Sequence, residues 1–436
     1  MIKRLALAGA TATLALGFAT TAMSIGHTSS HRRVVKPRHA APAIPDQVVQ
    51  WNQVLQKVLV APGAQPASIH PTRTMAITQI AVYDAVNGIL RRDRPLLVDI
   101  PGPRDASADA AAAAAAHTAL DALLPSQAAT IDASFTASMA QLPDSWAVRR
   151  GFAFGARVAR TVLAARSDDG ASANPPVFTP IAGPGHYQLT PPAMAPAGFT
   201  QTAHVTPFVL GSASQFRPGP PPALTSARYG ADFREVQSLG ELNSTTRTAD
   251  QTAIGTFWGA APVWVVWNQV ADQAAARFDH TLLQNARLFA VLDTTLADSA
   301  VALYDAKYTY ARWRPITAIT ASDQGNGVTS ADPNWVPLAN TANDPSYPGA
   351  HAEFSQAAAT VLDRFFGTDA FRFSLSNATV GITRTFSGFS QASAEASASR
   401  IFAGQHFRYD EDAGQTLGRD VAGFVLDRVL GHPEHR

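Results

Sequence analysis

Helical periodicity recurs along most of this chain, and an alanine-dominated run from Asp105 to Leu124 is its clearest example. Alanine has the highest intrinsic helix propensity, and its small side chain lets neighbouring helices pack closely. Apolar residues recur at helical spacing in further segments: residues 46–60, 73–90, 126–139, 146–165, 226–242, 248–312, 352–366 and 415–430. The pattern predicts an all-α fold with bundle-like packing.

A few positions carry more local expectations. Gly151 and Gly155 are one helical turn apart and predict a close crossing of two helices. Asp298 and Asp305 are expected to be exposed or paired with lysine or arginine. The segment 371–389 is rich in β-branched and aromatic residues, and its periodicity leaves two interpretations open, a short hairpin or a loop followed by a helix.

The first residues are typical of a secretory signal peptide. Met1 to Arg4 carries two basic residues and precedes a short apolar run, from Leu5 to Met23, that is rich in small residues. Such a run is a weak membrane anchor, and no later stretch is apolar over a membrane-spanning length. We therefore expect a signal peptide at residues 1–26 and a secreted or periplasmic protein that does not span a membrane once the signal is removed. An uncleaved anchor is the alternative.

Composition divides the rest of the chain into four parts. Residues 27–45 are basic and contain prolines, which predicts a disordered linker, and residues 46–166 form an N-terminal helical region. Residues 167–225 are rich in proline and glycine, and such a long irregular segment in a compact enzyme often covers or shapes a pocket. Residues 226–436 form the C-terminal helical region, in which we expect the functional site.

Charge and cysteine content exclude several functions. The formal net charge is only +1, whereas a dedicated nucleic-acid-binding domain normally has a basic excess. The chain has no cysteine, so neither disulfide bonds nor thiol catalysis is available. A site built from oxygen and nitrogen donors is therefore favoured.

The first candidate motif is a pair of cations in an aromatic setting. Lys307 and Arg314 are seven residues apart, which in a continuous helix would place both on one face, and Pro315 would then end or bend that helix. Four aromatic residues between positions 304 and 313 indicate burial. Because buried cations require an anion, the pair predicts an anion site, against the alternative of a solvated basic face.

The second motif is a turn that leads into a helix. Residues 344–351 read Asp-Pro-Ser-Tyr-Pro-Gly-Ala-His, and Pro348 and Gly349 mark a tight approach to the helix N-terminus. Free backbone amides and the helix dipole favour a bound anion there, with His351 at its mouth. Aspartates in this region also suggest a calcium or magnesium site, but their spacing fits no EF-hand loop.

The third motif combines an arginine, an imidazole and a carboxylate. Arg400 and His406 are six residues apart and could converge only if the chain turns between them, which Gly404 permits. Asp410 follows four residues after the histidine and could orient the imidazole through its second ring nitrogen. Taken alone, the segment is equally compatible with an ordinary helix end.

In order, the three motifs read Lys-x6-Arg-Pro, Pro-Gly-Ala-His and Ser-Arg-x5-His. This arrangement resembles the superfamily of vanadium-dependent haloperoxidases and type 2 phosphatidic acid phosphatases over roughly residues 250–430. The haloperoxidase branch is more similar, because its third motif typically contains a glycine two residues before the histidine and an aspartate four residues after it, as Gly404 and Asp410 do here. The resemblance implies a helical bundle with the site at one end of its C-terminal part.

The resemblance implies an oxyanion site made of three cationic side chains, two backbone amides and one imidazole: Lys307, Arg314, Arg400, Gly349, Ala350 and His406. His406 would bond to the vanadium of vanadate in a haloperoxidase or attack phosphorus in a phosphatase. His351 would act as a general acid and base, and Asp410 would support His406. The cofactor implied is vanadate, with phosphate in its place if the chain is a phosphatase.

One position departs from the family pattern. The family usually has Ser-Gly before the central histidine, whereas this chain has Gly349 and Ala350, so a hydroxyl that contacts the oxyanion is missing. Losing one hydrogen bond to a charged group costs about 1.5–3 kcal/mol, enough to weaken oxyanion binding tenfold or more.

Three functions follow as hypotheses. The first is an exported haloperoxidase whose partners are hydrogen peroxide, halide and a small organic substrate, with a homodimer left open and no nucleic acid. The second is a phosphomonoesterase with a phosphohistidine at His406. The third is a catalytically degenerate oxyanion-binding protein.

Overall fold

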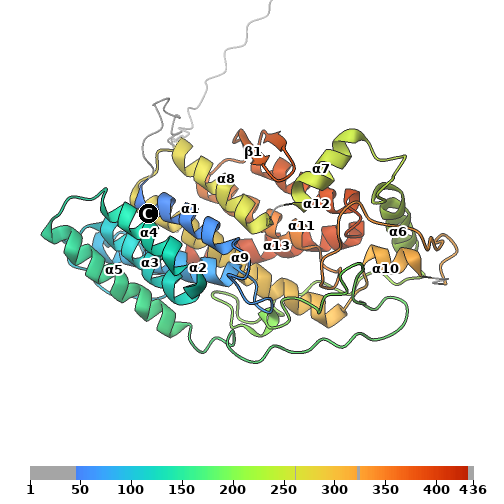
Figure 1. Ribbon diagram of the computed structural model, residues 1–436, viewed down its shortest axis with the longest axis horizontal. Helices are drawn as coiled ribbons and strands as arrows, with labels where there is room; N and C mark the ends of the chain where they lie inside the picture. The colour runs from blue at the N-terminus through green and yellow to red at the C-terminus, as the bar shows by residue number, and fades with distance from the viewer. Residues whose placement is uncertain (1–45, 261, 322–324, 431–436) are drawn as a thin grey trace, which may run out of the picture. The chain divides into compact units, whose positions relative to one another are not determined.

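The computed structural model describes residues 46–260, 262–321 and 325–430, all of which belong to one compact unit (Figure 1). Thirteen α-helices occur in this part of the chain: α1 Gln47–Leu59, α2 Thr72–Leu90, α3 Ala108–Leu123, α4 Ala128–Met139, α5 Trp146–Ala165, α6 Ala227–Leu239, α7 Ala249–Gly259, α8 Val263–Arg277, α9 Leu282–Tyr310, α10 Pro315–Thr320, α11 Ala350–Phe366, α12 Phe389–Phe402 and α13 Arg408–Val429. The all-α prediction is confirmed, while the expected signal peptide and linker lie outside the described residues.

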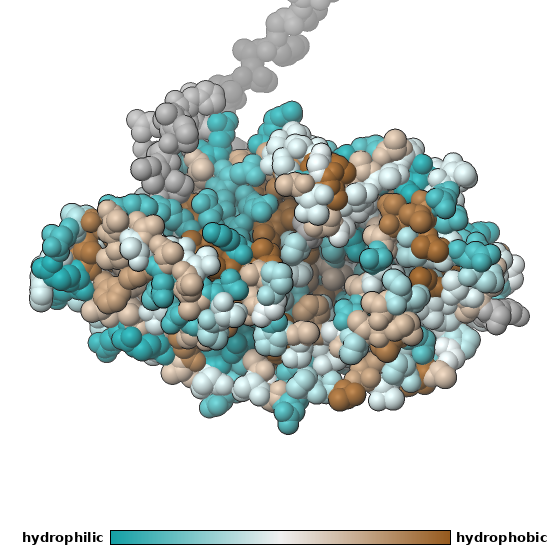
Figure 2. All heavy atoms as spheres, in the orientation of Figure 1, coloured by the Kyte–Doolittle hydropathy of each residue, from teal (hydrophilic) through white to brown (hydrophobic). Residues whose placement is uncertain are grey.

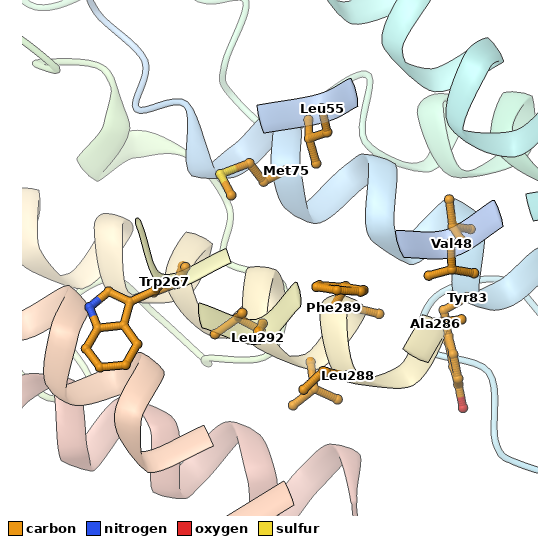
Figure 3. Close-up of a cluster of buried hydrophobic side chains, with 14 of the residues drawn as sticks. Val48, Leu55, Met75, Tyr83, Trp267, Ala286, Leu288, Phe289 and Leu292 are labelled. Atoms are coloured by element: carbon orange, nitrogen blue, oxygen red, sulfur yellow. The ribbon is translucent and has the colours of Figure 1, made fainter. Parts of the chain in front are cut away.

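Helix α9 is the axis of the fold. It is buried along most of its 29 residues, begins with a Thr281–Gln284 capping box, and packs against α2, α11 and α13. Figure 3 shows part of the core around it, where Phe289 and Leu292 lie among side chains from α1, α2 and α8. A helix whose residues are buried on nearly all sides lies at the centre of the fold. The end of α9 is therefore fixed from several directions, and it carries Lys307.

The alanine-rich helix α3 packs closely on α5. A β-carbon added at Gly155 would lie 2.1 Å from the Ala111 carbonyl oxygen, and one at Gly151 would lie 2.2 Å from the Ser107 carbonyl oxygen. Any larger residue at either position would push the two backbones apart. The close crossing predicted from these two glycines is confirmed.

The irregular segment between α5 and α6 is held by buried carboxylates. Asp298, in the middle of α9, accepts hydrogen bonds from three consecutive amides of that segment, those of residues 208–210. The expectation that Asp298 is exposed or paired with a cation was therefore wrong, because backbone donors satisfy it instead. Asp305 does pair with Arg217, as predicted. The segment is consequently anchored to the same helix that carries Lys307.

The helix that carries Lys307 ends before Arg314, the second cation of the first motif. Helix α9 ends at Tyr310, Ala311 adopts a left-handed conformation with φ 42°, and Arg314 is the N-cap of the short helix α10. The proposed placement of Lys307 and Arg314 on one face of a continuous helix was therefore wrong. Pro315 begins a helix here instead of ending one, since proline is well suited to the first helical turn.

The ambiguous segment after α11 is a hairpin. Strands β1 Phe373–Asn377 and β2 Ile382–Phe386 pair antiparallel, with Phe373 opposite Phe386. They form the two-stranded sheet of the described part of the chain. The hairpin packs its apolar face against the core near α12, which leads to the third motif.

The surface is mixed. On the face shown in Figure 2, hydrophobic residues lie in small groups between hydrophilic ones. None of the helices formed by the described residues combines the length and apolar content needed to cross a membrane.

Several polar side chains lie inside the bundle. Asp272 accepts hydrogen bonds from Asn52 and Gln56, and Asp293 accepts one from Asn268 at 2.8 Å while its second carboxyl oxygen has no partner among the described residues. Burial raises the pKa of Asp272 to about 7 and that of Asp293 to about 8, against the opposing effect of these hydrogen bonds. Both groups therefore favour the protonated form in the folded state.

The raised pKa of Asp293 predicts a pH-dependent effect of Asp293→Asn. Between about pH 4 and pH 8 the unfolded carboxyl ionises while the folded one keeps its proton, so the free energy of unfolding of the wild type falls as pH rises. Asparagine cannot ionise, so the variant should be more stable than the wild type at pH 8 by about 5 kcal/mol and should lose this advantage at pH 4. Thermal unfolding at both pH values measures the difference. An equal effect of the substitution at both pH values would contradict the assignment.

Candidate functional site

The three motifs meet around Arg314. Its Nη1 lies 3.0 Å from His406 Nε2 and donates to the Gln405 carbonyl oxygen at 3.0 Å, while its Nε donates to the Asp344 carbonyl oxygen at 2.8 Å. Lys307 Nζ donates to the Ser346 carbonyl oxygen at 3.2 Å. The end of α9, the turn before α11 and the loop before α13 are thus brought together. Figure 1 shows α9, α11 and α13 side by side.

Asp344 supplies an internal anion to the two cations. Its carboxylate lies 3.2 Å from Lys307 Nζ and accepts a hydrogen bond from Arg314 Nη2. All three side chains are buried. Burial alone would raise the pKa of the Asp344 carboxyl, but the Lys307 and Arg314 charges hold it below its ordinary value. Burial lowers the pKa of Lys307 to about 8, against the opposing effect of Asp344.

Sequence reasoning did not assign Asp344 to the site. Its proximity in sequence to the second motif was visible, but only a calcium or magnesium role was considered for it. The signal that could have identified it is the requirement that buried cations be paired, together with a carboxylate in the turn expected to approach them.

His406 is neutral and oriented. Burial, followed by the Arg314, Lys307 and Arg400 charges, lowers its pKa well below the ordinary value. Because a guanidinium can only donate, Nε2 facing Arg314 must be the acceptor, which leaves the proton on Nδ1. Nδ1 lies 3.3 Å from Asp410 Oδ2 and 3.3 Å from Ser346 Oγ. The predicted support of the imidazole by Asp410 agrees with this geometry, and the lone pair of Nε2 points toward the cations.

Asp410 organises more than the imidazole. Its Oδ2 also accepts hydrogen bonds from Ser346 Oγ at 2.6 Å and from the Phe407 amide at 2.9 Å. Burial raises its pKa to about 6, while these hydrogen bonds oppose the rise. Ser346, which sequence reasoning did not single out, thereby ties the second motif to the third.

His351 lies in the first turn of α11 and retains partial exposure. Its Nε2 lies 3.1 Å from the Trp258 carbonyl oxygen, which can only accept, so this nitrogen carries the proton. Burial and the Arg400 charge lower its pKa well below the ordinary value. The neutral ring therefore keeps Nδ1 available as a proton acceptor.

The backbone donors of the second motif differ from one another. The Gly349 amide, expected to bind the oxyanion, donates to the Asp410 carbonyl oxygen at 2.8 Å. Ala350 is the first residue of α11, and its amide has no backbone acceptor among the described residues. Helix geometry leaves the first amides without intrahelical partners, so Ala350 is the donor of this pair that remains for a ligand.

Arg400 is a buried cation without sufficient partners. It lies in the last turn of α12 and is 6% exposed, and neither Nε nor Nη1 has a hydrogen-bond acceptor among the described residues. Burial lowers its pKa to about 10, while the nearby Glu411 opposes this effect. Leaving two donors of a buried guanidinium unpaired is costly, so the residues present fit a tetrahedral oxyanion that accepts from Arg400.

An apolar pocket of about 540 Å³ is lined by residues that are near the site residues in sequence. It is lined by residues 188–194 of the irregular segment, by α10 and by residues 333–341. Arg314 caps the N-terminus of α10, and Asp344 follows shortly after the third lining segment. The expectation that the proline- and glycine-rich segment shapes a pocket is confirmed.

Comparisons with known proteins give one matching family and one matching relative. Residues 287–434 match the family model described as the second helical-bundle domain of vanadium chloroperoxidase, VCPO. The chain is 29% identical over 181 residues to the vanadium chloroperoxidase of Curvularia inaequalis, an alignment that covers 34% of this chain and 29% of that protein.

Solved structures share the fold over most of the chain. A bacterial vanadium-dependent iodoperoxidase is similar with a TM-score of 0.73 and 24% identity, over 87% of this chain and 94% of the other. A holo-type bacterial vanadium-dependent chloroperoxidase is similar with a TM-score of 0.67 and 16% identity, over 91% of this chain and 100% of the other. In the sequence of its C-terminal bundle and in its fold, the chain is similar to vanadium-dependent haloperoxidases.

Proposed function

We propose that the chain is an exported haloperoxidase that oxidises a halide with hydrogen peroxide at a bound vanadate. The observation that carries the proposal is the Arg400 guanidinium, which is buried and has two donor nitrogens without acceptors in the described residues. Similarity to vanadium-dependent haloperoxidases supports the choice of vanadate as the anion that fills this requirement. Export rests on the signal peptide predicted at residues 1–26.

The residues that would hold vanadate come from all three motifs. Lys307, Arg314 and Arg400 would balance its charge, and the Ala350 amide would donate to it from the helix N-terminus. His406 would offer the Nε2 lone pair, with the ring fixed by Asp410. Bound vanadate would supply the activation of hydrogen peroxide toward attack by a halide ion.

His406 and His351 would have different roles in the reaction. His406 keeps Nε2 free of a proton because its pKa is lowered and its Nδ1 proton faces Asp410 and Ser346. His351 would accept a proton at Nδ1 and return it, since its Nε2 proton is held by the Trp258 carbonyl oxygen. The partial exposure of His351 allows that proton to exchange with solvent. The apolar pocket of about 540 Å³ is of a size to admit a small organic substrate.

A phosphomonoesterase is the second candidate. The observation that favours it is again His406, a neutral imidazole whose Nε2 lone pair is aimed at a group of cations, as a nucleophile toward phosphorus requires. The same residues would then hold phosphate. Phosphate-ester hydrolysis without halide oxidation would select this function.

The central prediction concerns His406→Ala. The mature protein, loaded with vanadate and given peroxide and bromide, should brominate a phenol-type dye, and the variant should lose at least about a hundredfold in rate, as expected for removal of one catalytic imidazole. His204→Ala is the matched control, because His204 is an exposed histidine of the irregular segment. Dye bromination that does not require vanadate, or that survives in the variant, would contradict the proposal.

A second prediction concerns Asp344→Asn. Removing the carboxylate leaves Lys307 and Arg314 buried without their anion, which should lower the free energy of unfolding by on the order of 3 kcal/mol. Vanadate would then replace the lost negative charge, so the melting temperature of the variant should rise more on vanadate addition than that of the wild type. Differential scanning fluorimetry measures both effects.

Asp412→Asn is the control for this experiment, because Asp412 is an exposed partner of Arg228. It should change neither quantity appreciably. If vanadate raises the melting temperature of Asp344→Asn no more than that of the wild type, then Asp344 and the oxyanion do not share the same cations.

A further inference from the structure

Glu411 is a buried carboxyl that the proposed chemistry does not use. It lies in the first turns of α13 and is 1% exposed, and neither carboxyl oxygen makes a hydrogen bond of ordinary geometry within the described residues. The Ser397 hydroxyl is near enough to favour its charged form, but it leaves most of the carboxyl without a partner. A buried, unpartnered carboxyl is costly, so a group that binds beside Glu411 and pairs with it would be stabilised.

The position of Glu411 explains the glycine that departs from the family pattern. A β-carbon added at Gly349 would lie 2.2 Å from Glu411 Oε1 and 2.7 Å from its Cδ. The φ of Gly349 is −76°, which any residue can adopt, so the backbone does not demand glycine there. Glycine is required because the carboxyl fills the space in which a side chain at this position would stand.

The surroundings of Glu411 belong to the candidate site. Its Oε1 lies 3.8 Å from His406 Nδ1. Asp410 repels the carboxyl, while Arg400, with its unpartnered donor nitrogens, and Lys307 attract it. Glu411 therefore lies where a side chain at position 349 would stand, the position at which the family usually has a serine.

We infer that the Glu411 carboxyl replaces this hydroxyl and makes the hydrogen bond to an oxygen of the bound oxyanion that a residue-349 serine would make. One proton is shared in this contact. It can be carried by the carboxyl or by the oxyanion, since vanadate and phosphate are partly protonated near neutral pH, and the contact is the same in either case. The inference rests on the oxyanion-binding part of the proposed function and not on halide oxidation.

Oxyanion affinity of the purified full chain tests the inference. Isothermal titration calorimetry measures the affinity for vanadate and for inorganic phosphate, and the melting temperature of each protein is also recorded. The wild type is compared with five variants: Glu411→Leu, Glu411→Gln, Glu411→Ala, Gly349→Ser and the double variant Gly349→Ser/Glu411→Ala. Asp293→Asn is the control, because Asp293 is an equally buried acid with an unpartnered carboxyl oxygen but has Asn268 and Asp272 as its neighbours.

Glu411→Leu should weaken binding by about tenfold to a hundredfold, the scale of one hydrogen bond to a charged group. Glu411→Gln should keep the affinity within about threefold, because an amide can donate or accept. Gly349→Ser should lower both melting temperature and affinity, since its side chain would collide with Glu411. The double variant should recover both relative to Gly349→Ser and should bind more tightly than Glu411→Ala.

Three results would overturn the inference. The first is that Glu411→Leu binds the oxyanion as tightly as the wild type or more tightly. The second is that Glu411→Gln loses as much affinity as Glu411→Leu. The third is that the double variant binds no more tightly than Glu411→Ala. Absence of vanadate and phosphate binding in the wild type would overturn it together with the proposed function. The expected binding pattern without dye bromination would leave the inference standing and reject halide oxidation.

Discussion

The site is constrained above all by the need to balance three buried cations. Lys307 and Arg314 share the Asp344 carboxylate, whereas Arg400 keeps two donor nitrogens without acceptors in the described residues. Burying charge without a partner is far more costly than any single packing contact, so the arrangement is stable only because internal carboxylates and backbone carbonyls supply part of the negative charge. What they do not supply is left for a ligand. An oxyanion would therefore complete an incomplete set of charges, and its affinity would be set by competition with Asp344.

Helix ends place these groups. The last turn of α9 carries Lys307, the N-cap of α10 is Arg314, the first turn of α11 holds Ala350 and His351, and the last turn of α12 carries Arg400. The first amides of a helix lack intrahelical acceptors, and cations are favoured in the last turn of a helix. A helix N-terminus beside cations carried on the last turns of other helices therefore suits an anion. The core around α9 fixes these ends, as Figure 3 illustrates for its N-terminal part. Site geometry thus depends on packing far from the site.

Local patterns predicted the helices because periodicity and propensity act within a segment. The Gly151 and Gly155 crossing, the break at Gly404 and the support of His406 by Asp410 could be predicted for the same reason. Asp298 could not, because its partners are amides about ninety residues away in a segment without periodicity. Lys307 and Arg314 converge because helix α9 ends before Ala311, and no proline or glycine at that position predicts this helix end. The roles of Asp344 and Glu411 could not be predicted, because they depend on contacts between different motifs. The glycine at position 349 is explained by the Glu411 carboxyl, which lies on another helix.

The proposed chemistry depends on an oxyanion that binds between Arg400, Arg314 and His406. A crystal structure of the vanadate-soaked protein measures this directly. We expect anion density within bonding distance of His406 Nε2 and in contact with the Arg400 donors that lack acceptors. Vanadate bound elsewhere, with Arg400 satisfied by protein atoms and only Asp344 on the other two cations, would contradict the account.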